Sequence, residues 1–569
     1  MKRSIFSFAD PKDVRSLADL SAEDAKALLG GKGAGLFEMS RLGLRVPPGF
    51  TLTTDLCRAY YARKDSRRLT RFSAHASQEI LTSAVLKEFF AAVKGLEKSA
   101  GRTFGDPDNP LLVSVRSGSK FSMPGMMDTV LNLGLNDRTV RGLEAHTGNP
   151  RFAWDCYRRF IAMFGNVVKE IDKNHFEEAL KSIKARADIK ADSDLSTQSL
   201  ERLVGVYKEI YQEYAGFPFP QNPWDQLKMA VLAVFESWNN PRAIAYRKLN
   251  RLADGLGTAC TVQAMVFGNM GPDSATGVGF TRDPNTGEKA FFGEYLINAQ
   301  GEDVVAGIRT PHPLKSMKTD LPAVYRELSA VARRLEKKFR DIQDLEFTVE
   351  KGRLYMLQTR TGKRSAQAAL RSAVDMVAEK LITPEEAVRR LSPAQLDELL
   401  RPVFDSEALG RHHILAKGLP AGPGAACGRI MFSAGRAQEE AKRGPVILVR
   451  PETNPDDISG MAAAEGILTM TGGLTSHAAV VGRGLGKVCV VGCQTIEISE
   501  AAKTLRMNGR TLKEGDFISL DGFRGDVIDG QVPTKPSEIL EVLLGNLAPS
   551  KCELYEPYKT FMSWVDKAR

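Results

Sequence analysis

Apolar and polar positions divide the first 360 or so residues into short strands and longer helices. Runs such as Leu111 to Val115 have the length and composition of buried strands. Within residues 150–250, segments such as 176–180 and 200–214 repeat apolar side chains at the helical spacing. This pattern predicts a mixed α/β fold with a helix-rich insertion at about 150–250.

The pattern changes twice in the second part of the chain. Strand signals vanish over 362–405, where Thr383-Pro384-Glu385-Glu386 and Ser392-Pro393-Ala394-Gln395 each predict a capping box that opens a short helix. Glycine, alanine and valine then dominate, and buried strands are predicted at 446–449 and 466–470. A compact α/β domain followed by a helical tail fits this second change.

These changes predict a multi-domain α/β protein with four regions. A chain of 569 residues is too long for a single hydrophobic core. The predicted regions are an N-terminal α/β region at 1–361, a helical linker at 362–405, an α/β domain at 406–535 and a tail at 536–569.

The composition and the N-terminal sequence predict a globular protein and exclude several other classes. Hydrophobic residues make up 43% and charged residues 26% of the chain, which are ordinary globular values, and no apolar run approaches the roughly 18 residues of a membrane span. The N-terminus reaches Asp10 without the apolar stretch of a secretory signal, so we expect a cytoplasmic protein. The net charge of +9 is diffuse, suits anionic small substrates, and comes with no nucleic-acid-binding motif. The only close cysteine pair, Cys489 and Cys493, lacks clustered partners, which favours reduced core thiols over zinc.

The strongest chemical signal is the segment Thr471-Gly472-Gly473-Leu474-Thr475-Ser476-His477, which follows directly on a predicted strand. Two glycines permit a tight turn, Thr475 or Ser476 can cap a helix, and His477 falls in the first turn of that helix. The positive end of the helix dipole lowers imidazole basicity and stabilises a phosphoryl group. A neutral imidazole nitrogen is a competent nucleophile toward phosphorus. The plain alternative is a surface histidine at a helix start, but this context favours a catalytic His477.

The second signal is a hairpin formed by the strands near 344–349 and 354–360. Strand alternation places Asp344, Glu346 and Thr348 on one face, so two carboxylates point the same way. Two such oxygen ligands suit a magnesium ion. An amphipathic hairpin with one solvated face is the alternative.

The length of the hairpin loop decides which side chains face each other. A three-residue loop pairs Glu346 with Gln358 and Asp344 with Arg360. A two-residue loop sets Glu346 against Leu357 instead. We prefer the three-residue loop, because it gathers the two carboxylates and a phosphate-binding guanidinium on one face.

Two weaker signals precede the hairpin. The segment Gly30-Gly31-Lys32-Gly33-Ala34-Gly35 stands ahead of a helical pattern starting at Leu36 and suits phosphate binding, although it lacks the Walker A spacing and an ordinary turn explains it nearly as well. Arg116 alternates along a strand with Ser114 and shares its face. The buried strand expected at 262–266 either walls an adenine pocket or belongs to the core.

Read together, these segments resemble pyruvate phosphate dikinase from about Gly30 to the last residues. The segments 298–307 and 240–243 add to the resemblance. It implies that region 1–361 is an ATP-grasp nucleotide-binding unit and that region 406–535 is a swivelling phosphohistidine domain.

The resemblance also implies a set of site residues. His477 would be the phosphorylated nucleophile, assisted by Arg360 and Arg116, and Asp344 and Glu346 would hold Mg²⁺. In plant members of the family the position of Thr475 is a regulatory phosphorylation site. The full ATP and magnesium site implied by the resemblance is Lys32, Arg116, Glu302, Asp303, Arg309, Asp344, Glu346, Gln358 and Arg360.

The implied reaction uses ATP and phosphate. Histidine attacks the β-phosphorus of ATP, AMP leaves, and phosphate removes the outer phosphoryl group as pyrophosphate. The phosphohistidine then swivels to a separate barrel domain and phosphorylates pyruvate. Such transfers need positioning and positive charge more than covalent help.

One departure from the family is large, because the sequence ends at Arg569 with no C-terminal barrel. We therefore expect a fragment or a short form that carries out the partial reactions, with a separate pyruvate-binding domain as its partner. Two alternatives stay open, namely a phosphohistidine donor to another acceptor and a catalytically idle regulatory homologue. The family expectation is a homodimer, but a monomer fits a chain without the barrel.

Overall fold

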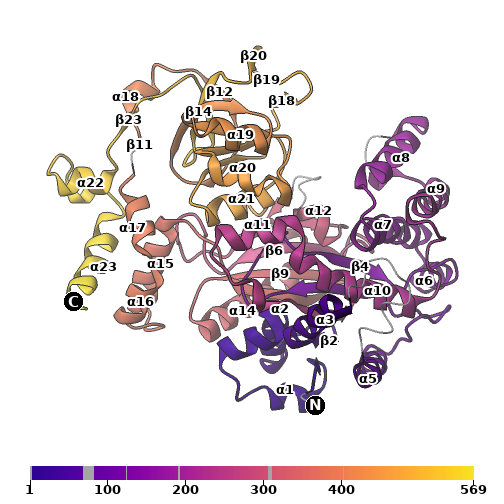
Figure 1. Cartoon of the computed structure of the whole chain (residues 1–569). Helices are drawn as coiled ribbons and strands as arrows, with labels where there is room; N and C mark the ends of the chain where they lie inside the picture. The colour runs from indigo at the N-terminus through magenta and orange to yellow at the C-terminus, as the bar shows by residue number, and fades with distance from the viewer. Residues whose placement is uncertain are drawn as a thin grey trace. The chain divides into compact units, whose positions relative to one another are not determined.

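The computed structural model describes residues 3–67, 82–123, 125–189, 192–305, 311–401 and 403–568. These residues form two compact units, one of Met1–Gly271 with Tyr355–Thr359 and one of Pro272–Leu354 with Arg360–Arg569. Helices and several sheets alternate along the chain (Figure 1), which confirms the mixed α/β, multi-domain prediction. None of the helices in the described ranges combines the length and the apolar content that a membrane crossing needs. The predicted boundaries at 361, 405 and 535 stay predictions.

The first unit is built on a five-stranded antiparallel sheet with the order β1-β2-β5-β3-β4. Its central strand β5 is buried along its whole length, and it is the strand expected near Val262. The strands are β1 (Ile5–Ser7), β2 (Gly49–Leu52), β3 (Val113–Gly118), β4 (Thr129–Leu133) and β5 (Ala259–Ala264).

Helices surround this sheet and fill the stretch predicted to be helix-rich (Figure 1). Three of them begin with an asparagine before a proline. The side chains of Asn149, Asn222 and Asn240 accept hydrogen bonds from N–H groups of the first turn that have no partner within the helix. The helices are α1 (Pro11–Ser16), α2 (Ala22–Arg41), α3 (Thr54–Arg67), α5 (Ser83–Ala100), α6 (Thr139–Thr147), α7 (Pro150–Lys169), α8 (Lys173–Arg186), α9 (Thr197–Ala215), α10 (Pro223–Glu236) and α11 (Pro241–Leu249).

The second unit begins with a five-stranded sheet in the order β10-β9-β6-β7-β8. Helix α14 packs against β9, and the side chains Leu345, Phe347 and Val349 are buried. The elements are β6 (Ala275–Phe280), β7 (Phe292–Ile297), β8 (His312–Pro313), β9 (Gln343–Glu350), β10 (Arg353–Thr361), α12 (Gly301–Val305), α13 (Met317–Asp320) and α14 (Pro322–Phe339).

The hairpin loop between β9 and β10 has two residues, so the three-residue loop that we preferred is wrong. Strand β9 ends at Glu350 and β10 begins at Arg353. Lys351 and Gly352 have φ of 48° and 73°, as a type I′ turn requires, and this turn matches the right-handed twist of the strands. Asp273 and Ser274 accept hydrogen bonds from the backbone N–H groups of Gly352 and Lys351, which tie the turn in place.

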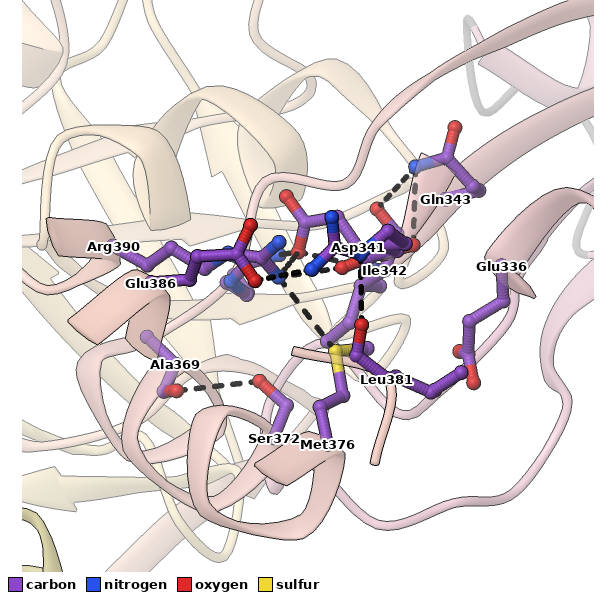
Figure 2. Close-up of polar contacts among 12 residues, drawn as sticks. Glu336, Asp341, Ile342, Gln343, Ala369, Ser372, Met376, Leu381, Glu386 and Arg390 are labelled. Carbon is purple, nitrogen blue, oxygen red and sulfur yellow. Dashed lines mark hydrogen bonds and ion pairs between the residues drawn. The ribbon is translucent and has the colours of Figure 1, made fainter. Parts of the chain in front are cut away.

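A helical segment follows the hairpin, and its arginines contact Asp341, which lies just before β9. It comprises α15 (Ala366–Ala378), α16 (Pro384–Arg390) and α17 (Pro393–Leu399). Both predicted capping boxes are present, with Thr383 paired to Glu386 and Ser392 paired to Gln395. Figure 2 shows Arg390 reaching the sulfur of Met376, and its guanidinium also lies 3.6 Å from the Asp341 carboxylate.

The last large element of the second unit is an eight-stranded sheet with the order β12-β22-β21-β14-β15-β16-β17-β13. Strands β14 to β17 are parallel to one another, and α19 (Ala434–Glu440), α20 (Ile458–Ala463) and α21 (His477–Gly484) accompany them (Figure 1). Both predicted strands are present, as β15 (Val446–Arg450) and β16 (Gly466–Thr469). The other strands are β12 (Ile414–Lys417), β13 (Leu419–Gly422), β14 (Ala425–Met431), β17 (Val488–Val491), β21 (Phe517–Asp521) and β22 (Asp526–Asp529).

Smaller elements complete the unit. A two-stranded ladder flanks the large sheet in sequence, a three-stranded sheet is inserted between its strands β17 and β21, and the tail is helical as predicted. These elements are β11 (Val403–Phe404), α18 (Ser406–Leu409), β18 (Ile496–Ser499), β19 (Thr504–Met507), β20 (Arg510–Lys513), β23 (Thr534–Lys535), α22 (Glu538–Leu543) and α23 (Tyr555–Lys567).

Candidate active site

The histidine segment forms the strand, turn and helix that its sequence predicts. Strand β16 ends at Thr469, Gly472 turns the chain with φ of 102°, and His477 is the first residue of α21. Ser476 stands at the N-cap position, but its side chain makes no capping hydrogen bond. The predicted hydroxyl cap is therefore wrong, since the Thr475 hydroxyl bonds Glu294 instead.

The imidazole of His477 is held at one nitrogen and left without a partner at the other. Nδ1 lies 3.0 Å from Oγ1 of Thr453. Nε2 is buried and has no hydrogen-bond partner among the residues that the structure describes. Burial lowers the pKa of His477 to about 4, and the carboxylate of Asp456 opposes this shift only in part. The ring is therefore neutral at pH 7, with Nε2 free to act as the nucleophile when Nδ1 carries the proton.

Thr453 is a site residue that the sequence reasoning missed. It follows β15, and His477 follows β16, which pairs with β15 in parallel. The loops after neighbouring parallel strands meet at the same edge of a sheet. The position of Thr453 just after a predicted strand was a signal that would have suggested this contact.

Glu294 of β7 holds the histidine loop. Its carboxylate accepts hydrogen bonds from the backbone N–H groups of Leu474, at 3.0 Å, and Thr475, at 3.2 Å, and from the Thr475 hydroxyl, at 2.9 Å. A Cβ atom on Gly473 would lie 2.4 Å from a carboxylate oxygen, so this approach requires glycine there. Burial raises the pKa of Glu294, and the three hydrogen bonds oppose that shift. No sequence pattern pointed to Glu294, because the contact joins segments 180 residues apart.

The hairpin strand β9 places two carboxylates beside one guanidinium. Arg360 Nε donates to Asp344 Oδ2 at 2.6 Å, and its Nη2 lies 3.8 Å from Glu346 Oε1. Asp344 is 1% exposed, and burial raises its pKa although Arg360 opposes the shift. The acidic pair and Arg360 therefore lie together as predicted, although the loop length was not.

The residues of this acidic pair fit a divalent cation. The second Asp344 oxygen, Oδ1, is buried and finds no hydrogen-bond partner in the described part of the chain. A buried carboxylate oxygen without a partner is costly, and a hard cation satisfies it. No group of three or more His, Cys, Asp or Glu ligands occurs in the described ranges. A cation on Asp344 and Glu346 would thus complete its shell with waters or substrate oxygens.

Lys32 lies inside a helix rather than in a loop ahead of one. Helix α2 runs over Ala22–Arg41 and is interrupted at Gly30, whose φ is 67°. A Cβ atom on Gly30 would lie 1.9 Å from the Gly118 carbonyl oxygen, and the N–H of Gly31 donates to Ser119 O at 2.7 Å. The predicted helix start at Leu36 is wrong, because α2 already begins at Ala22 and continues after Gly30. The glycines allow the helix to pack closely against the end of β3.

Arg116 and Gln358 belong to the same unit as Lys32. Arg116 Nη1 lies 3.5 Å from the Leu357 carbonyl oxygen. Gln358, the next residue, is buried, and Gly35 of α2 packs against Thr359. The first unit therefore brings the segments that carry Lys32, Arg116 and Gln358 against one another.

The remaining predicted residues lie around α12. The Asp303 carboxylate accepts a hydrogen bond from the Gln300 N–H at 2.9 Å and so helps to cap that short helix. The side chain of Glu302 and the whole of Arg309 lie outside the described residues.

Comparison with known proteins identifies the family. Residues 26–330 and 323–381 match the family described as pyruvate phosphate dikinase, AMP/ATP-binding domain, and residues 443–525 match the PEP-utilising enzyme, mobile domain. The chain is 52% identical over 544 residues to pyruvate, phosphate dikinase of Clostridium symbiosum, covering 95% of this chain and 59% of that protein. It is 47% identical over 569 residues to the chloroplastic pyruvate, phosphate dikinase 1 of Zea mays, covering 100% of this chain and 56% of that protein.

The Rhizobium meliloti pyruvate, phosphate dikinase is 48% identical over 565 residues, covering 97% of this chain and 59% of that protein. The chain thus spans a little over half the length of these relatives. The first family match covers most of the segment that holds the predicted nucleotide site, and the second includes His477. The chain belongs to the pyruvate phosphate dikinase family.

Proposed function

We propose that this chain uses ATP and phosphate to phosphorylate His477, as the first steps of pyruvate phosphate dikinase chemistry. The observation that carries the proposal is the state of the imidazole. Its Nδ1 is held by Thr453, its Nε2 is unpartnered, and its pKa is lowered to about 4. A buried neutral imidazole at a helix start is an unusual structural element and a suitable phosphorus nucleophile.

The first proposed step forms a bond between Nε2 and the β-phosphorus of ATP. The bond from that phosphorus to the α-phosphate oxygen breaks, and AMP leaves with the electron pair. Inorganic phosphate then attacks the outer phosphorus of the pyrophosphoryl-histidine and departs as pyrophosphate, which leaves phosphohistidine. In the tautomer with the proton on Nδ1, Thr453 Oγ1 accepts that proton's hydrogen bond, so the developing positive charge on the ring is stabilised as Nε2 bonds.

The proposed nucleotide site consists of the residues that the family resemblance implies. Lys32, Arg116 and Arg360 would stabilise the phosphates, with Gln358, Glu302, Asp303 and Arg309 completing the site. Asp344 and Glu346 would hold Mg²⁺, which on binding supplies positive charge to the transferring phosphoryl oxygens. The orphaned Oδ1 of Asp344 supports this assignment.

The proposed domains are the ATP-grasp unit at 1–361 and the swivelling phosphohistidine domain at 406–535. The mobile-domain match over 443–525 supports the second. Burial of Nε2 also supports movement, because the nitrogen must be uncovered before it meets a phosphorus atom. Thr475 is proposed as a regulatory site, since a phosphate on its hydroxyl would face the Glu294 carboxylate and repel it.

Pyruvate is the proposed final acceptor, as the names of the relatives state for those proteins. The observation that supports transfer to a further site is the placement of His477 at the edge of a separate sheet rather than on the acidic hairpin. Supplying pyruvate and a pyruvate-binding domain to labelled protein tests this step, and label that never reaches pyruvate would indicate another acceptor.

The test of the proposed function is acid-labile labelling. Protein incubated with Mg²⁺ and ATP labelled at the β-phosphate should acquire label that acid removes and base preserves. His477→Ala should abolish the label, and chelation of the metal should stop its formation. Label that survives in His477→Ala, or that forms equally fast in Asp344→Asn, would contradict the assigned roles.

A further inference from the structure

Arg483 lies in the last turn of α21, the helix that His477 begins. Its side chain is 4% exposed. Nη1 donates to the carbonyl oxygen of Ala421 at 2.9 Å, and Nη2 donates to the carbonyl oxygen of Leu474 at 2.8 Å. Leu474 belongs to the loop that delivers His477, so the guanidinium joins the end of the helix to the turn before its start.

The Leu474 peptide is therefore held from two sides. Arg483 binds its carbonyl oxygen, and Glu294 accepts its N–H at 3.0 Å. Leu474 precedes His477 by only three residues, so a rotation of this peptide would move the N-terminus of α21 and the imidazole with it. A neutral apolar side chain would fill the same space at lower desolvation cost but would leave the Leu474 carbonyl unpaired.

Several carboxylates act on the charge of Arg483. Burial lowers the pKa of its guanidinium, and the carboxylates of Asp344, Asp283 and Glu294 oppose that shift. The Phe280 ring lies 5.9 Å from the guanidinium carbon, and Nε has no hydrogen-bond partner within the described ranges. The same cation that fixes the histidine loop thus also interacts electrostatically with a proposed metal ligand, Asp344.

We infer that Arg483 is a positioning residue for the phosphorylation of His477. It fixes the Leu474 carbonyl and so sets the direction of Nε2, and its charge favours the arrangement in which the histidine loop faces the acidic hairpin. The inference rests on the proposed function, since it assigns a role within the labelling of His477. The hydrogen bonds of Arg483 go to the carbonyl oxygens of Ala421 and Leu474, so its effect on His477 passes through the loop.

The test is the single-turnover rate of histidine labelling from β-labelled ATP. Arg483→Met should lower this rate by about 10- to 100-fold, the effect of losing one or two hydrogen bonds from a charged donor. The dissociation constant for a non-reactive ATP analogue should not change. Arg443→Met is the matched control, because Arg443 lies in the same region with its side chain 68% exposed, and it should label at the wild-type rate.

Chemical rescue separates positioning from a general loss of structure. Guanidinium ion at millimolar concentration should raise the labelling rate of Arg483→Ala several-fold, but not that of His477→Ala or the wild-type protein. A wild-type rate in Arg483→Met, or a folded Arg483→Ala that guanidinium does not accelerate, overturns the inference. A wild-type protein that acquires no label overturns the proposed function instead.

Discussion

The hydrogen bond between Thr453 and Nδ1 of His477 determines which ring nitrogen is left without a partner. At 3.0 Å it fixes the ring plane and occupies one nitrogen. The buried, unpartnered Nε2 is then the atom that we propose as the nucleophile. The low pKa of the ring means that this atom keeps its lone pair throughout the neutral pH range.

The protonation of His477 should be insensitive to pH near neutrality. Its pKa is about 4 in the folded protein, against an ordinary value of 6.5. Between these values the unfolded chain binds more protons, so the contribution of the neutral ring to stability is full above about pH 6.5 and is lost as the pH falls toward 4. Histidine NMR titration should show one ring that stays neutral from pH 8 to pH 5.

The matched variant for this titration is His477→Gln. It should lack the non-titrating resonance and should lose less stability than the wild-type protein between pH 7 and pH 5. A His477 resonance that titrates near pH 6.5 would contradict the buried neutral ring.

Thr453→Val removes the partner of Nδ1 while keeping the shape of the side chain. We expect labelling of His477 to slow by about 2- to 10-fold, the effect of one hydrogen bond of 0.5–1.5 kcal/mol. Thr453→Ser keeps the hydroxyl and should retain most of the rate. Single-turnover labelling measures both variants, and equal rates in Thr453→Val and the wild-type protein would show that the bond does not orient the ring.

Among the helices, glycines have two different roles that the structure separates. Gly95 of α5 is exposed, and nothing lies within 4 Å of an added Cβ. Gly142 of α6 is buried, and an added Cβ would lie 1.8 Å from the carbonyl oxygen of Pro107. The first glycine only weakens its helix, whereas the second permits a close approach.

Gly95→Ala should therefore stabilise the protein and Gly142→Ala should destabilise it. The gain expected at Gly95 is about 0.5–1 kcal/mol, because alanine has the higher helix propensity and restricts the unfolded chain. The loss at Gly142 should exceed this amount, since backbone must move. Urea unfolding of the two variants measures both changes, and equal effects would contradict the packing described for α6.

The hairpin β9–β10 shows which features a strand pattern predicts and which it does not. Alternation correctly grouped Asp344 with Glu346, because side chains two residues apart on one strand share a face whatever the loop does. The contact of Arg360 with Asp344 joins the two strands, so alternation along one strand did not determine it. The loop length was wrong, because Lys351 adopts a left-handed conformation that nothing in the apolar pattern marks. The interruption of α2 at Gly30 was missed for a similar reason, since the contact with Gly118 is remote in sequence.

Within the second unit, Glu294 links the sheet of β7 to the loop of His477. One carboxylate accepts three hydrogen bonds from Leu474 and Thr475. All three hydrogen bonds depend on this one buried side chain, so they are lost together when the side chain moves away from the loop. A link of this kind suits the swivelling movement that we propose for the phosphohistidine domain.

Glu294→Gln should weaken this link, because an amide offers one acceptor oxygen and presents an NH₂ group to the loop N–H donors. We expect faster hydrogen exchange at the amides of residues 474 and 475 and a labelling rate lowered by roughly 10-fold or more, since hydrogen bonds to a charged group contribute about 1.5–3 kcal/mol. Glu288→Gln, on the exposed turn before β7, is the control and should leave both unchanged. Unaltered exchange in Glu294→Gln would contradict a carboxylate-dependent link.

Local patterns in the chain were enough to predict the alternation of strands and helices, the capping boxes at Thr383 and Ser392, and the place of His477 at the start of its helix. These features depend on neighbours within a few residues, where periodicity and capping chemistry act. The contacts of His477 and its loop were decided by the three-dimensional fold, and only the position of Thr453 after a predicted strand gave a sequence signal for one of them. Thr453 lies 24 residues from His477, Glu294 lies 180 residues from Leu474 and Arg483 lies 9 residues from Leu474. Such contacts follow from how the elements pack, which no single stretch of sequence encodes.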